Sequence, residues 1–133
     1  MTIGLPGGSE TILVVEDEAS LRNSIKRILI RQGYTVLEAR HGAEALQVMG
    51  ETKRAIDLVM TDLTMPGMSG RELIPELQAL SRPPRVLVMS GEQAVLRRDS
   101  LPPGTEFLEK PFTVEELLQT VRAVLDVKSV PPT

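Results

Sequence analysis

The strongest constraint on the fold is an alternation between short apolar runs rich in β-branched residues and longer segments with helical periodicity. The runs lie at residues 11–15, 35–39, 58–61, 85–89 and, more weakly, 106–109. The stretches TILVV, DLVMT and RVLVM are almost continuously apolar, which is typical of strands buried on both faces. The alternation therefore predicts an α/β domain with a parallel sheet and crossover helices.

Apolar spacing predicts two helices in the first half of the chain. The first carries a stripe at i, i+4, i+7 and i+8, and Gly33 predicts its end because glycine readily adopts the conformation of a helix C-terminus. The stripe consists of Leu21, Ile25, Ile28 and Leu29. The second helix is predicted before Gly50 from Ala43, Leu46 and Met49, with His41 as a solvated residue at its start.

Two later helices follow sequences with capping-box spacing. Ser69 to Glu72 precedes Leu73, Leu77 and Leu80, and Pro75 is a local conflict because an interior proline loses one backbone hydrogen bond. Thr113 to Glu116 precedes the last stripe, which consists of Leu117, Leu118, Val121 and Leu125. Between them, residues 93–98 allow only a short or irregular fourth helix, because Pro102-Pro103-Gly104 ends any helix there.

Length and composition limit the domain organisation and the possible functions. The chain of 133 residues predicts one domain at 10–127, with residues 1–9 and 128–133 as flexible head and tail. It has no cysteine, a single histidine, three aromatic residues (Tyr34, Phe107 and Phe112) and a net charge of -3. This composition argues against disulfides, thiolate catalysis, zinc sites and nucleic-acid binding. Without an apolar stretch of about 20 residues or a signal peptide, a cytoplasmic location without a membrane segment is expected.

Acidic residues follow two of the predicted strands. Glu16-Asp17-Glu18 follows the first, and Asp62 ends the third. In a doubly wound sheet, ligands bind outside the carboxyl ends of the strands. If the first and third strands are neighbours, as in the flavodoxin-like order 2-1-3-4-5, then Glu16, Asp17 and Asp62 converge. Because clustered carboxylates repel one another, a cation or proton must compensate, and oxygen donors favour Mg²⁺ over zinc.

A hydroxyl and an ammonium follow the remaining strands. Ser90 ends the fourth strand, and Lys110-Pro111 follows the fifth. Beside an acid-held cation, they would complete a cradle for phosphoryl oxygens and leave Asp62 as a nucleophile that forms an aspartyl phosphate.

At these residues the sequence resembles the receiver domain of bacterial two-component response regulators and hybrid sensor kinases. The resemblance covers residues 10–125 and rests on ILVVEDE, LVMTDLTMPGMSG, VLVMSG and FLEKPF in the expected order. Each motif is weak alone, but together they are highly specific. The resemblance implies a flavodoxin-like doubly wound sheet of order 2-1-3-4-5 with five helices, the fourth short or irregular.

The resemblance also implies a role for each matching residue. Asp62 would be the phosphoacceptor. Mg²⁺ would bind Glu16, Asp17, Asp62 and the backbone carbonyl of Thr64. The remaining roles fall on Ser90 (switch hydroxyl), Lys110 (phosphate-binding lysine), Pro111 (cis-proline position), Phe107 (switch aromatic), and Thr64 and Glu92 (tuning of dephosphorylation).

Two departures from the family pattern matter. The short segment between Ser90 and Lys110 puts in doubt dimerisation through the fourth helix, fifth strand and fifth helix. Phe107 replaces the tyrosine of many members, so its inward rotation gains no hydroxyl hydrogen bond and weaker coupling is expected.

The resulting hypothesis is a receiver that accepts a phosphoryl group from a phosphohistidine of a histidine kinase or histidine phosphotransfer domain, in the same or another chain. It predicts a signalling domain with at most self-phosphorylation and slow autodephosphorylation, favoured as part of a hybrid kinase. A stand-alone single-domain regulator and a docking module that has lost phosphorylation remain alternatives. Thr64 disfavours a phosphohydrolase because it stands where an acid/base is needed, and Glu16-Asp17-Glu18 would repel the phosphate of a flavin.

Overall fold

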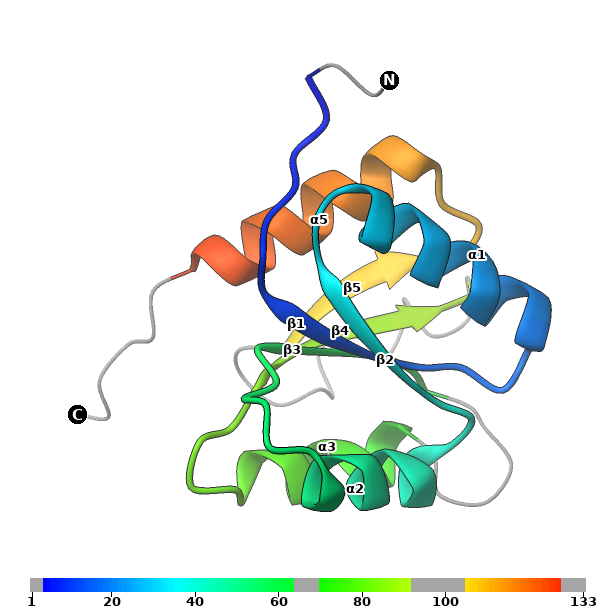
Figure 1. Ribbon diagram of the computed structural model, residues 1–133. Coiled ribbons are helices and arrows are strands. Elements are labelled where there is room, and N and C mark those ends of the chain that lie inside the picture. The colour runs from blue at the N-terminus through cyan, green and yellow to red at the C-terminus, as the bar shows by residue number, and fades with distance from the viewer. Residues whose placement is uncertain (1–3, 64–69, 92–104, 128–133) are drawn as a thin grey trace.

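The fold is a parallel sheet covered by helices on both faces (Figure 1). A computed structural model describes residues 4–63, 70–91 and 105–127. The sheet has five strands in the order β2-β1-β3-β4-β5, every pair being parallel. They are β1 (Thr11–Val15), β2 (Thr35–Ala39), β3 (Leu58–Asp62), β4 (Arg85–Ser90) and β5 (Thr105–Glu109). The flavodoxin-like fold class and strand order are therefore confirmed.

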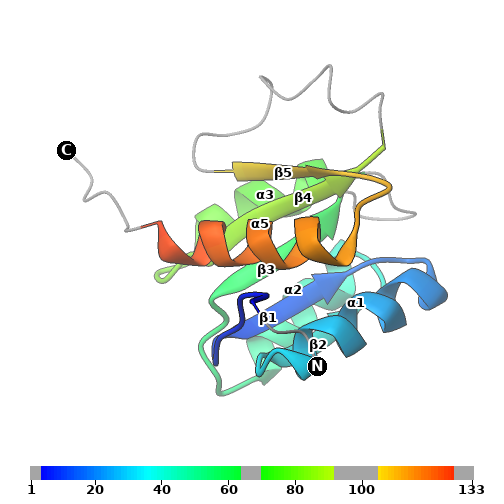
Figure 2. The same ribbon diagram turned by 90° about the horizontal axis from the view of Figure 1, so that it is seen from above.

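The described helices divide between the two faces of the sheet. They are α1 (Ala19–Arg31), α2 (Gly42–Glu51), α3 (Gly70–Gln78) and α5 (Val114–Asp126). Helices α1 and α5 cover one face and α2 and α3 the other, and Figure 2 shows α1 and α5 over the sheet from above. The fourth helix predicted at 93–98 lies outside the described residues.

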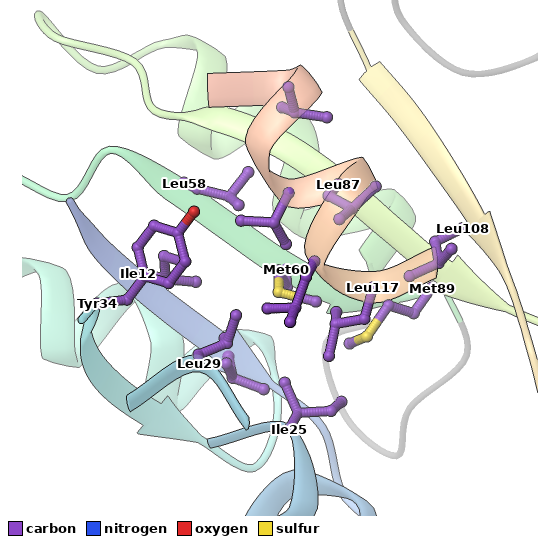
Figure 3. Close-up of a cluster of buried hydrophobic side chains, with 14 residues drawn as sticks. Ile12, Ile25, Leu29, Tyr34, Leu58, Met60, Leu87, Met89, Leu108 and Leu117 are labelled. Carbon is purple, nitrogen blue, oxygen red and sulfur yellow. The ribbon is translucent and has the colours of Figure 1, made fainter. Parts of the chain in front are cut away.

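Two hydrophobic clusters form the core, one on each face of the sheet. Successive side chains of a strand point to opposite faces, so Ile12 and Val14 join the α1/α5 cluster while Leu13 and Val15 join the α2/α3 cluster. Figure 3 shows the first cluster, which includes Ile12, Leu29 and Met60. Strands β1 and β3, with most of β4, are buried on both faces as their continuous apolar runs predict.

Local sequence signals place the strands and two helix ends correctly. Each predicted strand end lies within one residue of the observed end. Gly33, with φ of 99°, ends α1 in a Schellman motif, in which its N–H donates to Ile30 O (3.0 Å) and the Tyr34 N–H donates to Leu29 O (3.2 Å). Thr113 and Glu116 form the predicted capping box of α5, with both hydrogen bonds at 3.0 Å.

Helix α2 differs from its prediction. It continues through Gly50 to Glu51, and it buries Gly42 and Ala45 while Ala43 is exposed. His41 lies at the start of the helix as predicted, where it is half-buried and its Nδ1 accepts the Glu44 N–H at 3.1 Å as an N-cap. Leu46 and Met49 pack against the α2/α3 cluster as predicted, whereas Ala43 does not.

The prediction for α3 is also partly wrong. Leu80 was expected on its apolar face, but the helix ends at Gln78 and Leu80 is 39% exposed. Pro75 lies inside the helix with its side chain exposed. Ser69 of the predicted capping box lies outside the described residues.

Residues 5–8 belong to the stretch predicted as a flexible head or linker, and they hydrogen-bond to Gln32, just after α1, and to Arg122 of α5. The Gln32 side chain donates to Leu5 O and Pro6 O, both at 3.1 Å, and Arg122 donates to Gly7 O at 3.1 Å. A Cβ atom on Gly7 would lie 2.3 Å from Gln32 O, so glycine permits this close approach.

Within the described ranges, none of the helices has the length and apolar character needed to cross a membrane.

Candidate functional site

The site forms where the carboxyl ends of four strands meet at one edge of the sheet. The registers pair Val15 with Thr61, Asp62 with Met89 and Ser90 with Glu109. These pairings bring the residues at and just after the strand ends together, as expected for a doubly wound sheet.

Lys110 connects these strand ends. Its Nζ lies 2.6 Å from Asp62 Oδ2 and 2.9 Å from Glu16 Oε2, so it forms an ion pair with each carboxylate. Its backbone N–H donates to Ser90 O at 2.7 Å, and its peptide bond to Pro111 is cis. Asp62 and Glu16 therefore share one ammonium, and the main chain of the same lysine is hydrogen-bonded to the end of β4.

Glu16 is a buried acid held at several atoms. It is 1% exposed, its N–H donates to Ala39 O at 3.0 Å, and its Oε1 accepts the Glu18 N–H at 3.2 Å. Burial raises the pKa of Glu16 above its ordinary value, although the hydrogen bond from Lys110 opposes this shift.

The hydrogen bond that lowers the pKa of Glu16 raises the pKa of Lys110. Burial alone lowers its pKa, but the hydrogen bonds to Asp62 and Glu16 outweigh burial and raise the pKa above the ordinary value. Lys110 is consequently a cation at neutral pH, available to a further anion besides Asp62 and Glu16 at this edge of the sheet.

The predicted metal-binding acids are brought together only in part. Glu16 and Asp62 meet at Lys110, whereas the side chain of Asp17, the residue after Glu16, is exposed. Within residues 4–63, 70–91 and 105–127, no group of three or more acids or histidines has the arrangement of a metal site. The side-chain donors are all carboxylate oxygens, the ligand type that Mg²⁺ prefers, so the donor set fits Mg²⁺.

The predicted switch residues lie on neighbouring strands. Ser90 is buried at the end of β4, and Phe107 is half-buried on β5, where it packs against the α2/α3 cluster. Phe107 and Val124 of α5 also line a cavity of about 410 Å³. Thr64 and Glu92 lie outside the described residues.

A second cavity opens next to Lys110. It has a volume of about 390 Å³ and is lined by Leu21 of α1 and by Lys110, Pro111 and Phe112 of the β5–α5 loop. An apolar pocket therefore lies beside the acid–lysine cluster.

Sequence reasoning missed Arg22 and Glu38, which support the same strand end. Arg22 Nη1 donates to Glu16 O at 2.8 Å, and Arg22 Nε lies 3.4 Å from Glu38 Oε1. Neither residue interrupts a periodic pattern or belongs to one of the four family motifs, so the sequence does not indicate that the two side chains meet.

Comparison with known proteins identifies the family. The family model of the response regulator receiver domain matches residues 12–122. The chain belongs to this family. The receiver domain of the hybrid histidine kinase CckA has a TM-score of 0.74 and 33% identity, over 87% of this chain and 99% of that one.

Curated relatives place receiver domains in proteins of very different length. Sensor kinase CckA of Brucella abortus is 39% identical over 90% of this chain, which spans only 13% of the kinase. Sporulation initiation phosphotransferase F of Bacillus subtilis is 29% identical over 91% of this chain and 98% of its own length. The chain spans about half of the response regulator MprA of Mycobacterium ulcerans, which is 36% identical. The chain is therefore similar to part of a sensor kinase, to part of a response regulator and to almost the whole of a phosphotransferase.

Proposed function

We propose that Asp62 accepts a phosphoryl group from a phosphohistidine of a histidine kinase or histidine phosphotransfer domain. The observation that carries this proposal is the Lys110–Asp62 contact of 2.6 Å beside the buried Glu16, at the carboxyl edge of the sheet. A buried acid, an acceptor carboxylate and a fixed ammonium form an environment suited to holding phosphoryl oxygens.

The transfer exchanges one bond to phosphorus for another. An Asp62 oxygen attacks the phosphorus atom, the phosphorus–nitrogen bond of the phosphohistidine breaks, and its electron pair stays on the imidazole nitrogen. Lys110 pairs with Asp62 before the step and then accompanies the phosphoryl oxygens, so its charge offsets the added negative charge.

We assign the magnesium-binding role to Glu16, Asp17, Asp62 and the backbone carbonyl of Thr64. When bound, Mg²⁺ supplies positive charge that offsets the repulsion between these carboxylates and the phosphoryl oxygens. Glu16 is buried and hydrogen-bonded at both carboxylate oxygens, so its position is fixed before any ligand arrives.

The response to phosphorylation is assigned to Ser90 and Phe107. Ser90 lies at the end of β4, one backbone hydrogen bond from Lys110, and Phe107 lies on the adjacent strand. A new phosphoryl group that engages Ser90 and Lys110 would shift the end of β4 and favour a new position of the half-buried Phe107. Thr64 and Glu92 keep their proposed role in setting the rate of dephosphorylation.

We assign the apolar cavity lined by Leu21, Pro111 and Phe112 as the surface that contacts the donor protein, because it opens beside Lys110.

Similarity to the CckA receiver supports membership of a hybrid histidine kinase, while similarity to sporulation initiation phosphotransferase F supports a stand-alone regulator. The identity to the sensor kinase is the higher of the two, 39% against 29%, and favours the hybrid-kinase context.

The test is the intact mass of the wild type and of Asp62→Asn after incubation with acetyl phosphate, with and without Mg²⁺. We expect the wild type to gain one phosphoryl group only with Mg²⁺ and the variant to gain none. No gain in either protein would contradict the proposal and favour a docking module that does not depend on phosphorylation.

A further inference from the structure

Arg22 ties the loop after β1 to the neighbouring strand β2. It lies near the start of α1, and its side chain is only 15% exposed. Its Nη1 donates to the main-chain oxygen of Glu16 at 2.8 Å, while its Nε faces Glu38 Oε1 at 3.4 Å. One guanidinium thus bridges a carbonyl at the acidic site and a carboxylate outside it.

Glu38 holds Arg22 in place but also has a second partner. The Lys26 Nζ donates to Glu38 Oε2 at 2.9 Å, and Lys26 is more exposed than Arg22, at 38% against 15%. Both cations bind the same carboxylate, but of these two side chains Arg22 alone donates a hydrogen bond to Glu16. This difference provides a matched control within the chain.

The contacts form a continuous series from β2 to the phosphoacceptor. Glu38 binds Arg22, Arg22 binds the Glu16 carbonyl, the Glu16 carboxylate binds Lys110, and Lys110 binds Asp62. Glu16 is therefore held at its carbonyl by Arg22 and at its carboxylate by Lys110.

Arg22 does more than form an ion pair with Glu38, because it also holds the main chain at Glu16. An exposed ion pair contributes little to stability because water screens it, but Arg22 also fixes the peptide unit that joins Glu16 to Asp17. Partners that orient metal-binding groups commonly change metal affinity about 10- to 100-fold when they are removed. Loss of Arg22 would free the carbonyl and increase the movement of both acids.

We infer that Arg22 and Glu38 are positioning residues that hold Glu16 and Asp17 in the orientation required for Mg²⁺ binding. This inference rests on the proposed function, because it requires that the acids hold Mg²⁺. Neither side chain would touch the phosphoryl group. Their effect would pass through the Glu16 carbonyl and the loop that it begins.

The test compares Arg22→Gln with Lys26→Gln. Isothermal titration calorimetry measures the Kd for Mg²⁺, and thermal unfolding without Mg²⁺ measures stability. We expect the Kd to rise about 10-fold in Arg22→Gln and to change less than about 2-fold in Lys26→Gln. Arg22→Lys, which can reach one acceptor but not both in the same geometry, should give an intermediate Kd.

Further measurements separate positioning from stability. The Mg²⁺ concentration that gives half-maximal phosphorylation should rise in Arg22→Gln, with the rate recovering at saturating Mg²⁺. A lower Tm with an unchanged Kd would overturn the inference. If Arg22→Gln fails to fold, Glu38→Gln tests it with Arg22 present, and an unchanged Kd would again contradict it. If the wild type binds no Mg²⁺, the assignment of the acids to Mg²⁺ fails first, and this inference fails with it.

Discussion

Lys110 Nζ lies 2.6 Å from Asp62 Oδ2, although 48 residues separate the two in sequence. The contact exists because the sheet order places the ends of β3, β4 and β5 side by side. Lys110 also binds Glu16, so a single ammonium offsets two carboxylates. The ion pairs account for the raised pKa of Lys110 and keep a cation next to the candidate phosphoacceptor.

Lys110→Gln should slow phosphorylation of Asp62 about 100-fold, because removing one fixed group that stabilises developing charge typically costs that much. The measurement is the rate of mass gain with acetyl phosphate and saturating Mg²⁺. Lys53→Gln is the control, since Lys53 is exposed and lies outside the site. A rate for Lys110→Gln within about 2-fold of the wild-type rate would contradict a role of this lysine in the phosphorylation step.

Glu16→Gln should change how stability depends on pH. The pKa of Glu16 is raised above its ordinary value of 4.5 in the folded protein, so folding favours its protonated form. Its stabilising contribution is therefore complete below pH 4.5 and is lost as the pH rises through the folded pKa. The stability of the variant relative to the wild type should therefore increase from pH 4 to pH 7.

Urea denaturation at both pH values measures this difference. Glu76→Gln is the control, because it removes an exposed carboxylate from α3. A difference between Glu16→Gln and wild type that is constant with pH, or that falls as pH rises, would contradict the assigned direction.

Two glycine substitutions should have opposite effects. Gly33 has φ of 99°, and an added Cβ would lie 2.5 Å from Gly8 O, so Gly33→Ala should destabilise the fold by about 1–2 kcal/mol. Gly50 lies in α2 with no atom within 4 Å of an added Cβ. Gly50→Ala should therefore stabilise by about 0.5–1 kcal/mol. Chemical denaturation measures both, and a stabilising Gly33→Ala would contradict the observed close approach.

Thr113→Ala should lower the free energy of unfolding by about 1 kcal/mol, because it removes the side-chain oxygen that caps α5. Gln119→Ala, on the exposed face of the same helix, should change stability by less than about 0.5 kcal/mol. Equal effects of the two substitutions would show that the capping box contributes nothing to stability.

Strong local signals account for most of what the sequence predicted correctly. Continuous apolar runs identify β1, β3 and β4, because strands buried on both faces are apolar at most positions. The last helix was predictable from its capping box and stripe, and Gly33 marks the end of α1. The meeting of Glu16, Asp62 and Lys110 also follows once the strand order is assumed.

The errors arise where tertiary contacts override a local pattern. Gly50 does not end α2, and Leu80 does not belong to the apolar face of α3, because the length and the buried face of these helices depend on how they pack on the sheet. The composition around Pro6 also gives no sign of the hydrogen bonds that Gln32 donates to Leu5 O and Pro6 O and that Arg122 donates to Gly7 O. Arg22 and Glu38 carry no signal in the sequence because they meet only when α1 packs beside β2.

The most direct test of the central proposal locates the phosphoryl group on the chain. The wild type is incubated with acetyl phosphate and Mg²⁺, reduced with borohydride to convert the acyl phosphate to an alcohol, and sequenced as peptides by mass spectrometry. We predict reduction at Asp62 alone, and none in a sample that lacks Mg²⁺. A phosphoryl group on another carboxylate, or no reduction anywhere, would contradict the assignment of Asp62 as the phosphoacceptor.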